Sequence, residues 1–255
     1  MTKSKIIIAC KLLLLFVLVK INFSNQPQET TFPKIAFKAK SLTPATLQIL
    51  SKPAVRLLSF ANESMPLGNK RIDNTMKKVL RANSFHSLQT HKLHHKAQKW
   101  FSVIEPVLEK YGIPQDFKYI PLVESGLTTN LYSPRGAAGL WQFMPQTGRD
   151  FGLKVNGEID ERFNIKLSTV AAAKYFKSLY KIFGNWTLVA AAYNGGEGRI
   201  KKQMRTQKQA NYFKLKLNRE TGKYVYSIIS MKEIIEHPEK HGYKLRNPRL
   251  LAYQR

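Results

Sequence analysis

The sequence is short of cysteine and of acidic residues. Its single cysteine, Cys10, excludes an internal disulfide framework, so the fold has to rely on packing. Only 16 Asp and Glu residues stand against 42 Lys and Arg residues, which gives a formal net charge of +26 over 255 residues. Such an excess attracts acidic polymers, nucleic acid or anionic lipid, and by itself it does not choose among them.

Long alternating runs and membrane-length apolar runs are also missing. Without alternation of apolar and polar residues there is little signal for strands, so the sequence predicts a mostly α fold. The longest apolar run, residues 6–19, follows Lys3 and Lys5 and is shorter than the roughly 20 residues that span a bilayer as a helix. Residues 1–25 are therefore interpreted as an export signal or membrane-targeting segment, with lipidation at Cys10 as the alternative.

The remaining chain divides by composition. Residues 26–72 are polar and rich in proline, and we interpret them as a linker or peripheral segment. Helical periodicity then predicts one domain over residues 73–245, followed by a tail at 246–255. Within the domain we expect a core helix with Ser168 as its N-cap and Gly184 just past its end, and a second helix capped by Asn185.

Two clusters favour an ordinary solvated surface over a ligand site. Residues 201–216 carry six cations and no acid, but no nucleic-acid-binding motif accompanies them, so we expect no nucleic-acid partner. His91, His94 and His95 share one side of a predicted helix without a carboxylate or thiol nearby. We interpret them as an exposed polar face and expect no metal site.

One acid stands alone in an apolar segment. Glu124, in FKYIPLVESGL, is the only carboxylate between Asp116 and Asp150. A helix that starts near Pro114 and ends at Gly126 would place it in the last turn, where apolar cover and the helix dipole both favour the protonated form. Such a group suits a general acid, whereas the plain alternative is a surface glutamate at a helix end.

The segment that follows looks like the wall of a sugar-binding cleft. In SPRGAAGLWQFMPQTG, at residues 133–148, small residues leave room for a bulky ligand. Trp141 and Phe143 offer stacking surface, and Gln142 offers a hydrogen-bonding amide.

Three motifs in register carry a family resemblance. ESG at 124–126, SPRGAAGLWQFMP at 133–145 and AAYNGG at 191–196 resemble, in order and spacing, the lytic transglycosylase domain that cleaves bacterial peptidoglycan. With the flanking segments, the resemblance covers roughly residues 77–243. Over this range the sequence is similar to the membrane-bound members of the family, but their C-terminal LysM sugar-binding repeats do not follow it.

The resemblance implies a lysozyme-like helical domain with a loop-rich active-site cleft and a reaction that needs one acid and no cofactor. Glu124 would protonate the glycosidic oxygen between N-acetylmuramic acid and N-acetylglucosamine. It would then accept the proton of the muramoyl C6 hydroxyl, which closes on C1 as a 1,6-anhydro sugar. No water enters, so no second carboxylate is required; Asp150, Glu158, Asp160 and Glu161 are the nearest candidates for one.

The resemblance also implies roles for residues around the acid. Tyr193 would hydrogen-bond Glu124, and Tyr193, Ser133, Gln142 and Asn194 would bind the substrate. Other residues are expected in the cleft wall: Ser125, Gly139, Trp141 and Phe143.

The expected partner is peptidoglycan, in the periplasm or cell envelope, with membrane association left open and the protein a monomer. Two alternatives remain: a goose-type lysozyme-like hydrolase that delivers water to C1, and a cell-wall-binding protein without turnover.

Overall fold

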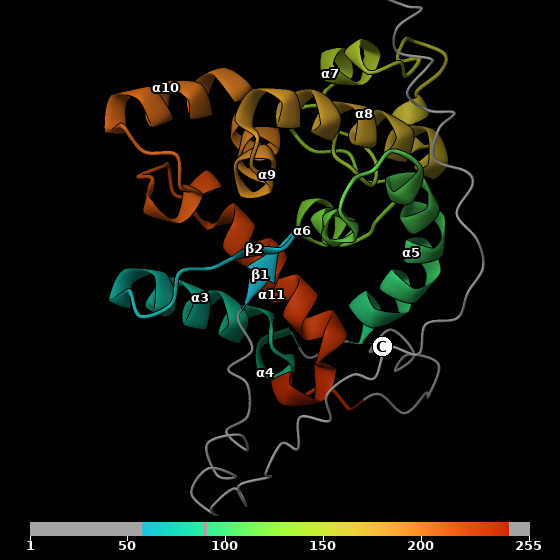
Figure 1. The fold of residues 1–255 in the computed structure, drawn as a ribbon. Helices are drawn as coiled ribbons and strands as arrows, with labels where there is room; N and C mark the ends of the chain where they lie inside the picture. Colours follow the sequence, from blue (N-terminus) through green and yellow to red (C-terminus); the bar gives the residue numbers. More distant parts are fainter. Residues whose placement is uncertain (1–57, 89–90, 245–255) are drawn as a thin grey trace, which may run out of the picture. The chain divides into compact units, whose positions relative to one another are not determined.

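Helices dominate the part of the chain that the computed structural model describes, residues 58–88 and 91–244 (Figure 1). The α-helices are α3 (Lys70–Asn83), α4 (Phe85–Leu88), α5 (Lys92–Lys110), α6 (Ile120–Glu124), α7 (Pro145–Asp150), α8 (Ile165–Phe183), α9 (Trp186–Gly195), α10 (Glu197–Gln207) and α11 (Thr221–Glu236). Short 3-10 helices are η1 (Gln115–Tyr119), η2 (Glu161–Phe163), η3 (Tyr212–Lys214) and η4 (Pro238–His241). The predicted mostly α class is confirmed.

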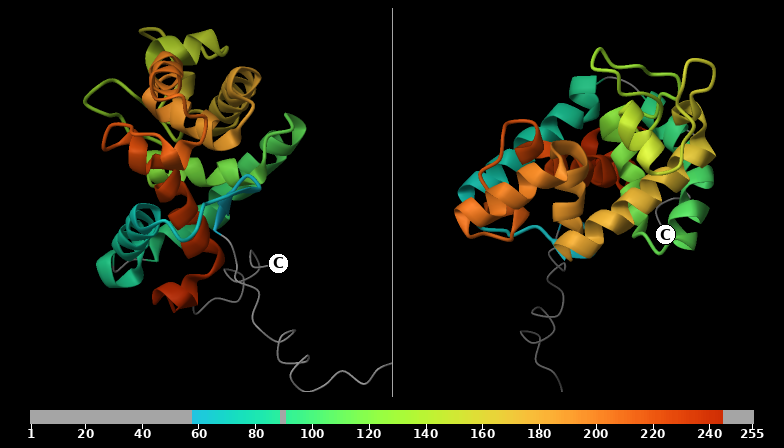
Figure 2. Two further views of the ribbon diagram at one scale, coloured as in Figure 1. Left: turned by 60° about the vertical axis from the view of Figure 1, so that its left-hand side comes forward. Right: turned by 90° about the horizontal axis from the view of Figure 1, so that it is seen from above.

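Helix α11 occupies the centre of this helical assembly. It packs against α3, α9 and α6, and in both views of Figure 2 it lies between α3 and α9. Ten of its sixteen residues are buried, and Val225, Ile228 and Ile229 are at most 1% exposed. A helix that buries most of its surface has to be covered by other elements on several sides, which explains its central place.

Capping residues set the ends of α8 and α9, the two helices that the sequence predicts around Gly184 and Asn185. Gly184 ends α8 in the left-handed conformation, as expected, and Asn185 caps α9 by accepting from the Leu188 N–H at 3.0 Å. The predicted N-cap of α8 is wrong. Asn164 caps it instead, and Ser168 lies buried one turn inside, with its hydroxyl donating to the Asn164 carbonyl at 2.6 Å.

Residues 58–72, the described end of the segment predicted at 26–72, contribute to the core, so this part of the segment is not peripheral. Strands β1 (Ser59–Phe60) and β2 (Glu63–Ser64) form an antiparallel hairpin whose two-residue turn has positive φ at both positions, as a type I′ turn requires. Phe60, Met65 and Ile72 are at most 2% exposed. Proline and polar residues dominate the composition here, but these few apolar residues are enough to anchor the segment.

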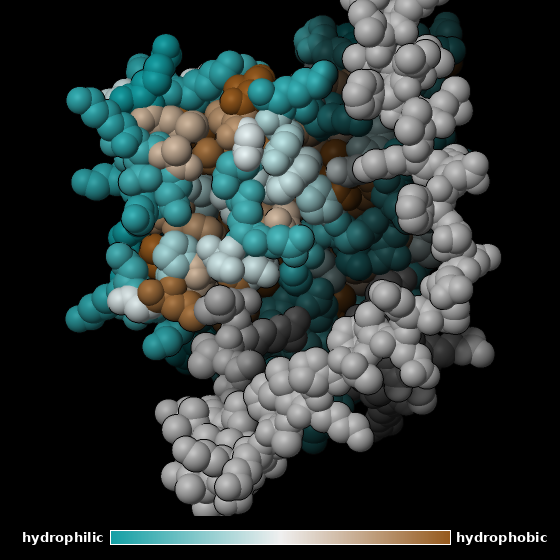
Figure 3. Space-filling model, viewed as in Figure 1, coloured by the Kyte–Doolittle hydropathy of each residue, from teal (hydrophilic) through white to brown (hydrophobic). Residues whose placement is uncertain are grey.

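Several predictions on the chain ends fall on residues outside the described ranges. These are the targeting segment at 1–25, residues 26–57 of the predicted linker and the tail at 246–255. Among the helices of the described ranges, none has both the length and the apolar character needed to cross a membrane. Where Figure 3 shows the described residues, their surface is largely hydrophilic, consistent with the high net charge.

Candidate active site

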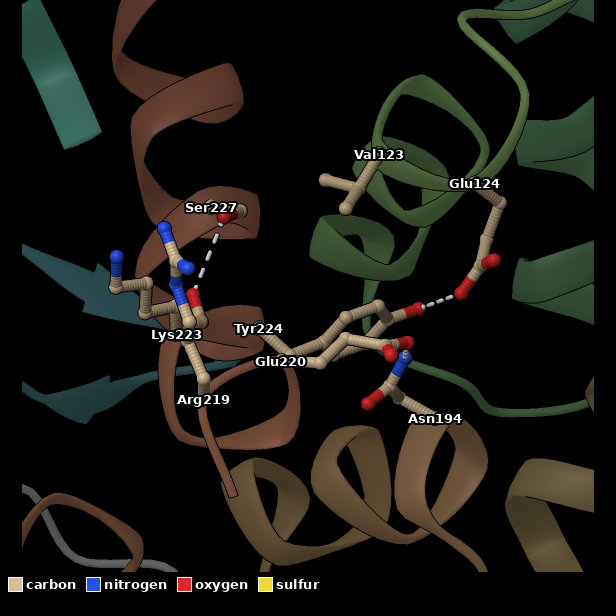
Figure 4. Close-up of a pocket in the computed structure, with 8 residues that line it drawn as sticks. All are labelled: Val123, Glu124, Asn194, Arg219, Glu220, Lys223, Tyr224 and Ser227. Carbon is tan, nitrogen blue, oxygen red and sulfur yellow. Dashed lines mark hydrogen bonds between the residues drawn. The ribbon is translucent and has the colours of Figure 1, made fainter. Parts of the chain in front are cut away.

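Glu124 is the last residue of α6, where three elements meet. The chain enters through η1, Pro121 occupies the first turn of α6, and positive φ angles at Gly126 and Leu127 turn the chain away. The expected position of Glu124 at a helix end is confirmed. Its side chain extends toward the C-terminal end of α9 and the N-terminal end of α11 (Figure 4).

A tyrosine holds the carboxyl of Glu124, but it is not the one predicted. The buried Tyr224, in the first turn of α11, donates its hydroxyl to Glu124 Oε1. The Tyr193 hydroxyl donates instead to the Trp141 carbonyl at 2.6 Å, so the expected Tyr193–Glu124 hydrogen bond is wrong. Sequence order could not decide between two tyrosines, because only the packing of α9 and α11 shows which hydroxyl reaches the acid.

Burial makes the Glu124 carboxyl a weaker acid than an exposed glutamic acid. Protein atoms surround the carboxyl except where pockets open onto it, and this loss of hydration raises its pKa from 4.5 to about 7. The hydrogen bond from Tyr224 acts in the opposite direction, and the charge of Glu220 raises the pKa further. At neutral pH the carboxyl is therefore available in both protonated and ionised forms.

Glu220 is a second carboxylate at this site, which the sequence reasoning missed. It lies just before α11 and accepts from Asn194 Nδ2 at 2.9 Å, while Asn194 Oδ1 accepts from the Thr221 hydroxyl at 2.9 Å. A Cβ on Gly195 would come within 2.8 Å of the Thr221 side chain, so glycine allows this close approach of α9 and α11. The i, i+4 spacing of Glu220 and Tyr224 was the signal that could have grouped them on one helix face.

Two pockets meet at Glu124, and both are also lined by Asn194 and Glu220. The aromatic pocket, of about 210 Å³, is lined on its own side chiefly by Ala137, Gln142, Phe143, Tyr175 and Tyr193. The cationic pocket, of about 580 Å³, is lined on its own side by Val123, Arg219, Lys223, Tyr224 and Ser227. The Glu124 carboxyl thus lies where the two pockets meet.

Four of the predicted residues line the aromatic pocket: Gln142, Phe143, Tyr193 and Asn194. Gln142 adopts a left-handed backbone conformation with φ of 50°, and its amide donates to the Gly139 carbonyl at 2.8 Å. That bond fixes the amide at the pocket edge. Phe143 and Tyr193 contact each other edge to face, with ring centroids 6.1 Å apart.

Three residues that were predicted in the cleft wall line neither pocket and instead stabilise the loop between α6 and α7. Trp141 is fully buried and donates from Nε1 to the Thr169 hydroxyl at 2.9 Å, so it offers no stacking surface. Ser125 is buried and donates to the Leu140 carbonyl at 2.9 Å. A Cβ on Gly139 would lie 2.0 Å from a backbone oxygen, so this glycine permits close packing and not ligand access.

The other predicted residues of this region also stabilise the loop. The Ser133 hydroxyl accepts from the Ala137 N–H at 2.9 Å, and Ser133 lines neither of the two pockets. Asp160, a candidate second acid, forms an ion pair of 2.6 Å with Arg162, whose hydrogen bonds hold the pKa of Asp160 below its usual value. Arg162 also donates to the Phe143 carbonyl at 2.9 Å. The sequence does not predict that Arg162 holds the loop between α6 and α7 through these hydrogen bonds.

The three histidines do not share the predicted exposed face: His95 is exposed and His91 is half-buried, but His94 is not accessible. His94 is buried, its Nε2 lies 3.2 Å from the Ile234 carbonyl, and burial lowers its pKa. Within the described ranges no three His, Cys, Asp or Glu side chains are grouped as metal ligands.

Comparison with known proteins identifies a family domain in the chain. Residues 102–216 match the family described as Transglycosylase SLT domain. The chain is 32% identical, over 197 residues, to membrane-bound lytic murein transglycosylase D of Escherichia coli strain K12, covering 74% of this chain and 43% of that protein. It is 36% identical over 92 residues to peptidoglycan transglycosylase gp16 of Escherichia phage T7, covering 35% of this chain and 7% of that protein.

A solved structure, the 70 kDa soluble lytic transglycosylase of Escherichia coli, is similar at a TM-score of 0.41 and 21% identity, covering 71% of this chain and 28% of that one. The chain spans less than half the length of the first curated relative. The motif resemblance and the sequence match agree: the chain carries a Transglycosylase SLT domain at residues 102–216 and is distantly related to membrane-bound lytic murein transglycosylase D.

Proposed function

We propose that the protein cleaves the β-1,4 bond between N-acetylmuramic acid and N-acetylglucosamine in peptidoglycan and leaves 1,6-anhydromuramoyl ends. The observation that carries this proposal is Glu124, a carboxyl with a pKa of about 7 at the junction of two pockets. The matched relatives, whose names describe transglycosylases of murein and peptidoglycan, support the same reaction.

The proposed reaction uses Glu124 twice. In its protonated form it donates a proton to the glycosidic oxygen, and the bond from that oxygen to the muramoyl C1 breaks. The C6 hydroxyl oxygen then bonds to C1 and its proton passes to Glu124, which restores the starting acid. A carboxyl with a pKa near the working pH suits both steps, because it can donate and accept a proton without a large penalty in either direction.

Tyr224 and the aromatic pocket have supporting roles in this proposal. The Tyr224 hydroxyl orients the carboxyl and stabilises its ionised form after the first proton transfer. Gln142, Asn194 and Tyr193 would contact the sugar that occupies the aromatic pocket. Aromatic faces and side-chain amides are suited to pyranose rings, which present both apolar C–H faces and hydroxyl groups.

Glu220 supports a second candidate function, a lysozyme-like hydrolase. Hydrolysis at C1 generally uses a pair of carboxylates, one as acid and one as base or nucleophile. Glu220 lines both pockets beside Glu124, so the chain offers such a pair. Its hydrogen bond from Asn194 also suits a purely orienting role.

The proposal includes the cell envelope as the place of action and peptidoglycan strands as the partner, with the protein a monomer that needs no cofactor. The apolar run at residues 6–19 and the printed name of the relative as membrane-bound support this location.

Substitution of the two carboxylates tests the proposal. We expect Glu124→Gln in the full chain to keep the fold and to lose at least about a hundredfold in release of soluble muropeptides from purified sacculi, because the amide cannot donate the proton. Glu220→Gln should keep measurable turnover if the reaction is a transglycosylation. Substantial activity in a folded Glu124→Gln protein would exclude the proposed role, and loss of all activity in Glu220→Gln would favour the hydrolase.

A further inference from the structure

The two pockets beside Glu124 differ in chemical character. The aromatic pocket is lined by Phe143, Tyr175 and Tyr193. The cationic pocket has Arg219 and Lys223, which extend from the N-terminal end of α11 and the turn before it (Figure 4). A strand of neutral sugar rings would use aromatic and amide contacts on both sides, so this difference indicates that the two pockets bind different parts of the substrate.

Two acids, Glu124 and Glu220, line the same pocket, but neither is ion-paired with the two cations. In the described part of the chain, neither Arg219 nor Lys223 forms an ion pair, and both are exposed to the pocket. The adjacent Glu220 is engaged by Asn194 on the opposite side. The pocket therefore presents two unpaired cationic groups that are available to an anion.

High net charge alone does not explain this arrangement as a site, because many cations of the chain lie on open surface. Lys202 and Arg205, for example, are exposed on α10 and line neither pocket. Arg219 and Lys223 differ because they line a space of about 580 Å³ that is continuous with the catalytic acid. A space of this size accommodates a group as large as a substituted sugar.

The substrate of the proposed reaction carries a matching anion on only one of its two sugars. N-acetylglucosamine is neutral. The muramoyl residue carries a lactyl group, which ends in a carboxylate when it is free of peptide and otherwise continues into a stem peptide with its own carboxylates. Arginine pairs with a carboxylate through two parallel hydrogen bonds, and lysine adds a mobile point charge.

We propose that Arg219 and Lys223 bind a carboxylate carried by the muramoyl residue, and thereby set the direction in which a strand lies across Glu124. This inference rests on the proposed function for the identity of the substrate. The shared chemistry is a carboxylate close to the glycan, and it has two sources: the lactyl group of peptide-free strands or the stem peptide of intact ones.

The test measures binding separately from turnover. In the full chain with Glu124→Gln, so that strands are not consumed, the double variant Arg219→Gln/Lys223→Gln is compared with the matched control Lys202→Gln/Arg205→Gln. Both remove one arginine and one lysine charge. The ligands are soluble strands with stem peptides and strands from which an amidase has removed the peptides, each before and after conversion of carboxylates to neutral methylamides.

We expect the pocket variant to weaken binding of a carboxylate-bearing strand about tenfold, and the control to weaken it less than about twofold. Neutralised strands should bind the two variants equally. The source of the carboxylate is the stem peptide if the loss occurs with peptide-bearing strands only, and the lactyl group if it occurs with stripped strands. Equal weakening by both double variants, or a loss that persists on neutralised strands, overturns the inference.

Turnover separates this inference from the proposed function. With Glu124 intact, the pocket variant should raise KM for the carboxylate-bearing strand and leave kcat nearly unchanged. Absence of anhydromuramoyl products from the unsubstituted protein contradicts the proposed function, whatever the dissociation constants show. Products that form normally, with no difference in binding between the pocket and control variants, contradict the inference alone.

Discussion

Burial of Glu124 makes the stability of the fold depend on pH in a way that one substitution isolates. The folded state raises the pKa of Glu124 from 4.5 to about 7. Below pH 4.5 the group is protonated in both folded and unfolded chains, and above pH 7 it is ionised in both. Between these values the folded chain keeps a proton that the unfolded chain has released, so stability falls as the pH rises.

The size of this effect follows from the pKa difference. A shift of about 2.5 pH units corresponds to about 3.4 kcal/mol at 1.36 kcal/mol per unit. Because the carboxyl is partly open to the pockets, we expect about 2 to 3 kcal/mol. Glu124→Gln removes the charge and keeps the acceptor for Tyr224, so its stability relative to the unsubstituted chain should increase by that amount from about pH 4 to about pH 8.5.

Urea unfolding followed by tryptophan fluorescence, at several pH values, measures this difference in the full chain. All other titrating groups are shared by the two proteins and cancel in the comparison. Glu158→Gln is the matched control, since it removes one acid from an exposed loop and reports the general effect of charge. If the stability difference between Glu124→Gln and the unsubstituted chain stays constant with pH, or equals that of the Glu158→Gln control, the Glu124 carboxyl is not buried as the structure indicates.

Three further substitutions test the surroundings of the acid. Tyr224→Phe removes the hydrogen bond that lowers the pKa of Glu124, so the alkaline limb of kcat/KM against pH should move to higher pH; an unchanged profile would contradict this contact. Gly139→Ala combines a φ of +76° with a Cβ 2.0 Å from a backbone carbonyl of η2, and should lower the free energy of unfolding by more than about 2 kcal/mol, whereas Gly157→Ala, with open space around it, should change it little. Trp141→Phe leaves a buried hydroxyl without its donor and a small cavity, so we expect a loss of about 1 to 3 kcal/mol in urea unfolding; a fully stable variant would argue for a surface position.

The sequence predicted the helical fold and the acid because both leave local signals. Gly184 and Asn185 mark a helix end and the next helix start through backbone conformation and capping, which depend on neighbouring residues only. Glu124 was identifiable because it is an isolated charge in an apolar segment. Its role as the catalytic acid stays a prediction until turnover is measured.

The partners of the acid were harder to predict because they come from distant parts of the chain. Tyr224 reaches Glu124 across 100 residues, and only the packing of α11 against α6 brings them together. The sequence predicts Trp141 in the cleft wall because it is an aromatic residue in a glycine-rich loop. Such a residue can point either into the cleft or into the core, and the sequence does not show which. The loop turns it into the core, where Thr169 accepts its N–H.

The most direct test of the account is the chemical nature of the new chain ends. Purified sacculi are digested with the full chain, and the released muropeptides are analysed by mass spectrometry, with Glu124→Gln as the control. The account predicts 1,6-anhydromuramoyl ends, one water lighter than the corresponding hydrolysis products, and none from Glu124→Gln. Ordinary reducing ends would contradict it in favour of a lysozyme-like hydrolase, and untouched sacculi would contradict it in favour of a wall-binding role.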